Sequence, residues 1–278
     1  MKRSLYLLLV TCLPAFLLQA CFQDMDYPEF DYPDSSAEKV YSPMKMFLTF
    51  EDDIRDKGNY GFLVMDNGNV KFTEGINGKA YQGSSDAYAL AKAPSYLSDS
   101  IPELGSCTVV FWMKSTKNTS ATGLFTIPNA KTYWGNFDIF LENNNSETQA
   151  FFKMHLYNNT SVKENDERWV EAKIDDVLTN EWVHMAFVYD GNQSIVTIYK
   201  NGESVLVKEL PGYGKLKFKD LNTFALGAFQ FSTQPLLTTG TNAKPNWASN
   251  YAGLLDQFRF YNTAVSASEI QKLYTEKE

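Results

Sequence analysis

The sequence is poor in residue types on which several protein classes depend. Its 278 residues include three cysteines and two histidines, and 25 basic residues stand against 33 acidic ones. The formal charge is −8, and it would be −10 without a leader containing Lys2 and Arg3, because the basic residues then fall to 23. Once a leader is removed only Cys21 and Cys107 remain, which excludes a disulfide framework. The basic residues are scattered among acids, which argues against nucleic acid as a partner.

The apolar run Leu5–Leu18 is too short for a membrane-spanning helix and follows a basic start, which is typical of a secretory signal peptide. It ends in Leu18-Gln19-Ala20-Cys21, which resembles a bacterial lipobox, although Gln19 departs from the commonest pattern. In a lipobox the small residue permits cleavage and the cysteine is acylated. We therefore predict a signal peptide at residues 1–20 and lipidation at Cys21. The alternative is an ordinary signal peptide with an incidental cysteine.

Residues 21–43 are predicted to be a lipidated, extended tether. The segment FQDMDYPEFDYPDSSAEKVYSP is rich in acids and proline and has no periodic pattern. Acids directly after the lipidated cysteine resemble the surface-export signal of Gram-negative glycan foragers, although a solvated tether explains the same residues. The predicted location is the outer membrane of a Gram-negative bacterium, facing outward.

From Met44 onward the chain alternates short strand-like segments with turn residues, which indicates an all-β fold. Asp190-Gly191 and Asn201-Gly202 separate paired runs and predict hairpins, so Glu181–Lys208 should form three antiparallel strands. Ser266 and Glu269 predict a capping box at the start of a short C-terminal helix. No second pattern of hydrophobic periodicity follows, so residues 44–278 are expected to form one domain.

His184 and Cys107 are the residues that most invite a catalytic interpretation. Period two places His184 beside Ala186 and Val188 within a strand that is apolar on both faces. No serine or cysteine motif accompanies it, so a packed, hydrogen-bonded histidine is the favoured interpretation. Cys107 shares its face with apolar residues and is predicted to be a core residue.

In their order along the chain, the segments resemble the laminin G-like domains of the concanavalin A-like lectin and glucanase superfamily. The resemblance lies in FLTFEDDIRDKGNYG, GKAYQGSSDAYALA, CTVVFWMK, EWVHMAFVYDG, IYKNGE, FALGAF and YAGLLDQFRFYNTAVSASEIQKLY. It covers nearly all of residues 44–278. It implies a two-sheet antiparallel jelly-roll sandwich that binds glycans or proteins at its concave face or rim. Ligands differ widely among members, so the fold alone does not set the function.

Some relatives in this superfamily are glycosidases, which need two carboxylates flanking the scissile bond. The retaining members carry Glu-x-Asp-x-x-Glu or a close variant. The nearest segment here is Glu164-Asn165-Asp166-Glu167, whose final acid comes too early to share that face, so we interpret the segment as a charged surface loop. We expect no enzyme activity, although carboxylates from distant strands remain an alternative.

A structural calcium ion held by oxygen ligands is a further hypothesis. Asp256 shares strand parity with Phe258 and Phe260, and a buried carboxylate must be hydrogen-bonded or bound to a cation. Acids in the opening loop could complete the site. The candidate ligands are Glu51, Asp53, Asp56 and Asp256, with hydrogen bonds from backbone amides to Asp256 as the alternative.

Aromatic residues in segments of low periodicity are the candidate glycan-binding residues: Tyr133, Trp134, Trp169, Tyr213, Trp247 and Tyr251. Such rings stack on the apolar faces of sugars while neighbouring polar groups bind hydroxyls. The leading hypothesis is a surface-anchored, carbohydrate-binding lipoprotein that assists polysaccharide capture by outer-membrane uptake proteins. A protein-binding adhesion or structural module and a glycoside hydrolase with dispersed carboxylates are the alternatives.

Overall fold

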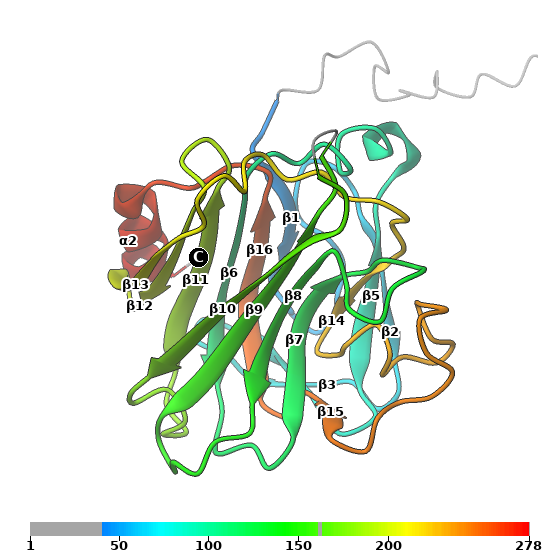
Figure 1. Cartoon of the computed structure of the whole chain (residues 1–278). Coiled ribbons are helices and arrows are strands. Elements are labelled where there is room, and N and C mark those ends of the chain that lie inside the picture. Colours follow the sequence, from blue (N-terminus) through cyan, green and yellow to red (C-terminus); the bar gives the residue numbers. More distant parts are fainter. Residues whose placement is uncertain (1–40, 161–162, 278) are drawn as a thin grey trace, which may run out of the picture. The chain divides into compact units, whose positions relative to one another are not determined.

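The computed structural model describes residues 41–160 and 163–277. The predicted signal peptide, Cys21 and most of the predicted tether lie outside these residues. Tyr41–Glu278 form one compact unit, built from two antiparallel sheets packed face to face (Figure 1). The expected all-β sandwich with a short C-terminal helix is confirmed. Among the described residues, no helix has the length and apolar character needed to cross a membrane.

The first sheet, called sheet A, contains eight strands. Seven follow one another in the order β13 (Glu203–Glu209), β12 (Ile195–Lys200), β11 (Val183–Asp190), β6 (Cys107–Lys114), β16 (Leu254–Tyr261), β4 (Lys79–Gln82) and β3 (Lys71–Glu74). The eighth, β1 (Met44–Leu48), pairs with the C-terminal half of β16.

The second sheet, sheet B, also contains eight strands. Its order is β10 (Asp166–Ile174), β9 (Ala150–Asn158), β8 (Phe137–Glu142), β7 (Ala121–Ile127), β14 (Phe224–Leu226), β5 (Tyr88–Lys92) and β2 (Leu63–Asn67). The short strand β15 (Ala248–Asn250) runs parallel to β7, whereas the other paired strands are antiparallel. A 3-10 turn, η1, spans Ser95–Leu97.

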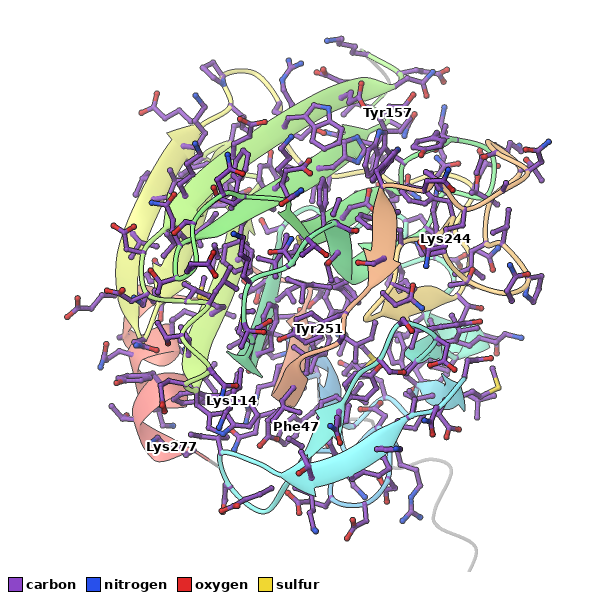
Figure 2. All side chains as sticks on the ribbon, turned by 90° about the horizontal axis from the view of Figure 1, so that it is seen from below. Phe47, Lys114, Tyr157, Lys244, Tyr251 and Lys277 are labelled. Atoms are coloured by element: carbon purple, nitrogen blue, oxygen red, sulfur yellow. The ribbon has the colours of Figure 1, made fainter. Side chains whose placement is uncertain are left out.

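The core lies between the sheets and follows from the period-two patterns of their strands. On β11, Val183, Met185 and Phe187 face the other sheet. Ala186 and Val188 point the opposite way, into a smaller cluster with Ile270 of the helix α2 (Ala267–Glu276). Because α2 packs on the outer face of sheet A at this strand, β11 is apolar on both faces. In Figure 2, Lys277 lies at the end of α2 and Tyr157 lies on the sheet B side.

The turn residues behave as expected at one hairpin and differ at the other. Asn201 and Gly202 have φ values of 50° and 83° and join β12 to β13 as a two-residue turn. Asp190 instead ends β11, and four residues, 191–194, lead to β12. The Asp190 carboxylate accepts hydrogen bonds from the N–H groups of Asn192 and Gln193, which stabilises this longer turn. At α2, Ser266 accepts a hydrogen bond from the Glu269 N–H, which confirms Ser266 as the N-cap, the first half of the predicted capping box.

His184 and Cys107 are both core residues. Cys107 is fully buried, and burial raises the pKa of its thiol. His184 is fully buried and packs against the rings of Trp112 and Tyr274, at centroid distances of 5.1 and 5.9 Å. The prediction of a hydrogen-bonded imidazole was wrong, because neither ring nitrogen has a hydrogen-bond partner among the described residues. Burial, together with the charge of Arg259, lowers the pKa of His184 to about 3, so the ring is neutral at physiological pH.

Candidate binding site

The outer face of sheet B, turned away from sheet A, carries a cluster of aromatic residues. We call the partly exposed rings of Tyr133, Trp134, Trp169 and Trp247 the aromatic platform. They come from three places in the chain: the connection between β7 and β8, the strand β10, and the residue before β15. Phe140, Phe229 and Phe231 are buried in the same cluster and form its floor.

The loop that presents Tyr133 and Trp134 is fixed by one buried amide side chain. The Nε2 atom of Gln230 donates hydrogen bonds to the carbonyls of Thr132 and Tyr133 at 2.7 and 2.8 Å. Its Oε1 atom accepts a 2.8 Å hydrogen bond from the Asn129 N–H. Thr238 adds a hydrogen bond to the Thr132 carbonyl. Because Gln230 is fully buried, these bonds hold the loop in one conformation without help from solvent.

Trp134 is the centre of the platform. Its ring lies 4.9 Å from that of Trp169, at an interplanar angle of 85°, and 6.0 Å from that of Trp247. Phe140 lies parallel to it at 5.5 Å, and Tyr133 stacks on Phe231 at 4.7 Å. Trp169 and Trp247 remain 36% and 45% exposed, so both present ring surface to solvent. Aromatic surface supported from beneath and open above can receive a flat, partly apolar ligand.

Two of the six candidate glycan-binding residues lie outside the aromatic platform. Tyr213 and Tyr251 are 2% and 1% exposed and belong to the core between the sheets. The Tyr213 hydroxyl donates to the Asp166 carbonyl, and the Tyr251 hydroxyl lies within hydrogen-bonding distance of the Lys114 and Leu254 carbonyls. Both tyrosines are therefore anchors that join loops to strands, and neither belongs to the aromatic platform.

The acidic segment Glu164–Glu167 is only in part the surface loop that we expected, because Glu164 and Asn165 lie in a bend whereas Asp166 and Glu167 begin a strand. Residues 166–174 form β10, which pairs with β9 over its whole length. Val170, Ala172 and Ile174 face the core, and the alternate residues face outward. This alternation places Glu167 and Trp169 side by side on the outer face. The period-two pattern was present in the sequence, but the acids at its start concealed it.

A carboxylate–histidine–carboxylate chain lies beneath the platform and was not predicted from the sequence. His155, on β9, is fully buried. Its Nδ1 atom is 3.0 Å from Asp138 Oδ2 on β8, and its Nε2 atom is 3.1 Å from Glu167 Oε1 on β10. Burial lowers the pKa of His155, but the hydrogen bonds and charges of Asp138 and Glu167 outweigh burial and raise it above 6.5. The contact of these three side chains depends on the register of β8, β9 and β10, which no local sequence pattern indicates.

The predicted calcium ligands do not come together. Asp53 pairs with Arg55 and Lys57. Asp56 accepts hydrogen bonds from the N–H groups of Phe47, Gly58 and Phe62. Within the described part of the chain, no three His, Cys, Asp or Glu side chains are grouped to hold a metal ion. The four-carboxylate set was therefore wrong, because two of its members serve the loop that follows β1.

Glu51 and Asp256 do share one location, the turn between β3 and β4. Glu51 accepts a hydrogen bond from the Lys79 N–H, and Asp256 accepts hydrogen bonds from the N–H groups of Ile76 and Gln257 at 2.8 and 2.7 Å. Burial raises the pKa of Asp256 to about 7, although these backbone hydrogen bonds lower it. Hydrogen bonding to backbone amides, the alternative considered for Asp256, is what the structure contains.

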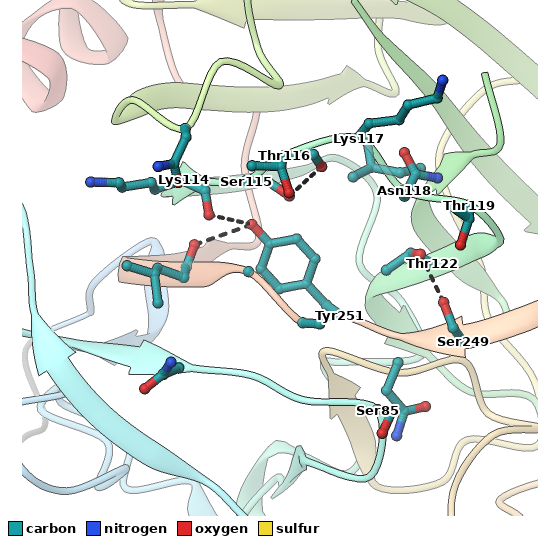
Figure 3. A pocket seen from close by; sticks show the side chains of 17 residues that line it. Ser85, Lys114, Ser115, Thr116, Lys117, Asn118, Thr119, Thr122, Ser249 and Tyr251 are labelled. Carbon is teal, nitrogen blue, oxygen red and sulfur yellow. Dashed lines mark hydrogen bonds between the residues drawn. The ribbon is translucent and has the colours of Figure 1, made fainter. Parts of the chain in front are cut away.

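A cavity of about 480 Å³ opens at one end of the sandwich (Figure 3). Its walls come from both sheets, with Lys114 and Leu254 on one side and Thr122 and Leu141 on the other. The Thr122 and Ser249 hydroxyls are 2.9 Å apart, and Tyr251 also lines the cavity. None of the platform residues lines this cavity. The aromatic platform therefore remains the better-supported candidate for ligand binding.

Comparison with known proteins places the chain in a family. The family model described as the concanavalin A-like lectin/glucanases superfamily, laminin G type, matches residues 82–271. The chain belongs to this superfamily. The match includes β6 to β16, and thus every residue of the platform. The resemblance inferred from the sequence motifs is therefore confirmed. A search of curated proteins finds no significant match.

Solved structures that are similar to this chain include binding domains of botulinum neurotoxins. The binding domain of botulinum neurotoxin DC in complex with rat synaptotagmin II has a TM-score of 0.59 at 13% identity, and the match covers 85% of this chain and 52% of that one. The same domain in complex with SialylT has a TM-score of 0.60 at 12% identity, with equal coverage. The binding domain of Paraclostridial Mosquitocidal Protein 1 has a TM-score of 0.60 at 14% identity and coverages of 84% and 52%. The chain thus spans about half the length of these domains, and the likeness concerns the fold.

Proposed function

We propose that the protein binds carbohydrate through the aromatic platform on the outer face of sheet B. The observation that supports this most directly is the contact of three tryptophan rings, of which Trp169 and Trp247 are 36% and 45% exposed. Soluble proteins seldom leave large contacting rings exposed without a ligand or partner for them. The apolar faces of sugar rings are suitable stacking partners for indoles.

The chemistry around the rings favours a polyhydroxylated ligand over a purely apolar one. Glu167 is half-exposed beside Trp169, and Glu142, Lys153 and Glu171 form ion pairs on the same outer face. Such groups can donate to or accept from sugar hydroxyls at the edge of a stacked ring. Neutral oligosaccharides of several residues would contact more than one of the three indoles.

Binding without hydrolysis is the favoured form of this function. A glycosidase needs a general acid whose pKa is raised, together with a second carboxylate. The hydrogen bond from His155 lowers the pKa of Glu167, and Asp138 lies buried on the other side of the imidazole. Release of reducing sugar from a polysaccharide that the protein binds would contradict this proposal.

A protein ligand is the second candidate. It is favoured by one observation, that a solved domain with the same fold was crystallised with rat synaptotagmin II. The two candidates differ in what the platform would contact, since a protein partner would retain its affinity after enzymatic removal of its glycans. Comparison of binding before and after deglycosylation therefore separates them.

We further propose that Cys21 anchors the protein to the outer membrane, where it assists uptake proteins in capturing polysaccharide. The lipobox-like segment before Cys21 supports this part of the proposal. In a Gram-negative host, labelled palmitate should be incorporated into the wild-type protein and not into Cys21→Ala. Label retained by the variant would contradict acylation at this position.

The central experiment is a binding screen against neutral hexasaccharides built from glucose, mannose, xylose or galactose, together with the parent polysaccharides. We expect at least one class to bind, and Trp169→Ala to abolish that binding. Trp182, which precedes β11 in sheet A, provides a matched control, because Trp182→Ala should leave binding unchanged. A panel with no binding ligand, or binding unaffected by Trp169→Ala, would overturn the proposal.

A further inference from the structure

The connection between His155 and the platform is both a ring contact and a chain of hydrogen bonds. The imidazole lies 4.5 Å from the Trp169 ring and 5.8 Å from the Trp134 ring, measured between centroids. It is thus the polar group directly beneath both indoles. A positively charged imidazole in this position would also attract the electron-rich ring faces.

The hydrogen bonds lead from the loop that carries Trp134 to Glu167, the outward-facing neighbour of Trp169 on β10. Asp138 accepts hydrogen bonds from the Thr126 hydroxyl and from the N–H of Gly135, the residue that follows Trp134, both at 2.9 Å. Its second oxygen also contacts His155, which in turn contacts Glu167. The pKa of Glu167 is lowered chiefly by the hydrogen bond from His155. The hydrogen bonds therefore run from the Trp134 loop to Glu167, which lies beside Trp169 on the outer face of β10.

We propose that protonated His155 is the positioning residue of the aromatic platform, and that loss of its proton weakens ligand binding. This proposal rests on the proposed carbohydrate-binding function and adds pH regulation to it. Only an imidazolium has two N–H donors, one for each carboxylate. A neutral imidazole retains one donor and turns a lone pair toward the other carboxylate, which repels it.

The burial of the two carboxylates decides which contact is lost. The Asp138 side chain is 1% exposed, whereas that of Glu167 is 45% exposed. A buried carboxylate that loses its donor cannot be solvated, so the remaining proton should stay on Nδ1. Glu167 can turn into water instead. The imidazole beneath Trp169 would then be held on one side only, by Asp138, and the angle between the Trp134 and Trp169 rings would no longer be fixed.

Other charged groups near His155 do not change the direction of this effect. On its own strand, Tyr157 stacks on the imidazole at 6.0 Å, and burial raises the pKa of its hydroxyl, so it stays neutral through the range in which His155 titrates. Lys153, two residues away on the same face, pairs with Glu142 and Glu171. The raised pKa of His155 places the loss of affinity above pH 6.5.

The test combines a ligand-free measurement with a binding measurement on the full-length protein. By NMR, the imidazole signals of His155 and the indole N–H signal of Trp169 should titrate with the same midpoint. His184 is an internal control, because its lowered pKa keeps it neutral above pH 5. For a hexasaccharide that binds in the neutral panel, affinity should fall about tenfold across that midpoint, which corresponds to about 1.4 kcal/mol.

Two matched variants on β10 test whether titration of His155 causes the loss of affinity. Glu167→Gln removes one of the two charges that raise the His155 pKa, so the midpoint of both measurements should move to lower pH. Glu171→Gln, on the same face of the same strand, should leave the midpoint unchanged. An equal midpoint in wild type and Glu167→Gln, or a Trp169 signal that does not follow His155, would overturn the proposal. If no hexasaccharide binds at any pH, the NMR titration still tests the positioning role, and only the proposed function fails.

Discussion

The three tryptophans of the platform differ in how much of each ring the fold itself uses. Trp134 contacts Phe140, Phe229 and Phe231 as well as both other tryptophans. Trp247 lies at the edge, 45% exposed, with contacts to Trp134, Phe229 and Phe231. The same substitution should therefore have different consequences at the two positions.

We expect Trp247→Ala to weaken glycan binding at least tenfold while lowering the free energy of unfolding by less than about 1 kcal/mol, because little buried contact is lost. Trp134→Ala should weaken binding and also cost about 2 to 4 kcal/mol of stability, since it leaves a cavity above the phenylalanine floor. Calorimetric titration and chemical denaturation measure the two effects separately. A Trp247→Ala variant that loses stability but keeps its affinity would identify Trp247 as a loop anchor.

Asp256 is a residue whose charge should set the pH dependence of stability. Its pKa is raised from 3.8 to about 7 in the folded protein, mainly by burial. The folded state therefore keeps a proton that the unfolded chain releases between these values. The stabilisation from this group is complete below pH 3.8 and is lost as the pH rises to about 7.

The free energy of unfolding of the wild type should therefore fall between pH 4 and 7 relative to that of Asp256→Asn, by about 1 to 3 kcal/mol. Urea denaturation at a series of pH values measures the difference. Asp99→Asn, at an exposed carboxyl group, should run parallel to the wild type. A rise in the stability of the wild type relative to Asp256→Asn over this range would show that the folded-state pKa of Asp256 is lowered.

Among the elements, the turn between β3 and β4 determines whether the predicted calcium ion has a site. Calcium binding stays a prediction, now limited to Glu51 and Asp256. Calcium usually takes six to eight oxygen ligands, so two carboxylates would need backbone carbonyls and water in addition. A cation would also have to replace the proton on Asp256.

If calcium binds there, it should raise the melting temperature more at pH 8 than at pH 5, and a chelator should reverse the rise. Glu51→Gln should reduce the effect, whereas Asp53→Asn should not, because Asp53 pairs with Arg55 and Lys57. If neither calcium nor chelator changes the melting temperature at pH 8, calcium does not bind there, and backbone hydrogen bonds alone compensate for the burial of Asp256.

The strands show how far the sequence alone could predict the fold and the site. The alternation in β11 and the Asn201-Gly202 turn are local patterns, and both were predicted correctly. Trp134, Trp169 and Trp247 were identified as candidates by their residue type and neighbours. The contact of His155 with Asp138 and Glu167 could not be predicted, because it depends on the register of β8, β9 and β10. Tyr213 and Tyr251 were misplaced because burial of a loop residue depends on what packs over it.

At the scale of the whole molecule, both sheets share one core. Phe125 of sheet B and Phe258 of sheet A are 5.1 Å apart, and both belong to one cluster of buried residues. Neither sheet can lose this contact without exposing apolar surface of the other. We therefore expect one cooperative unfolding transition for residues 41–278, with equal calorimetric and van't Hoff enthalpies.

Phe125→Ala should shift that single transition to lower temperature without dividing it, at a cost of about 3 to 5 kcal/mol. Differential scanning calorimetry of both proteins measures this. Two resolved transitions in the wild type would reveal a domain boundary within these residues.

The number of proteins displayed together should determine the effective strength of glycan capture. The platform is an open surface rather than an enclosed pocket, so a single oligosaccharide should bind with a Kd of about 1 μM to 1 mM. When many copies are anchored on one membrane, a polysaccharide that leaves one platform can bind the next, and avidity can exceed the single-site affinity by about 10² to 10⁴.

Wild-type cells should therefore retain polysaccharide far longer than soluble protein does. For a monovalent oligosaccharide, the retention time on cells should equal that on soluble protein. Cells producing Cys21→Ala should lose this gain while the purified variant keeps its single-site affinity. Equal retention by cells with and without Cys21 would show that capture does not depend on the lipid anchor.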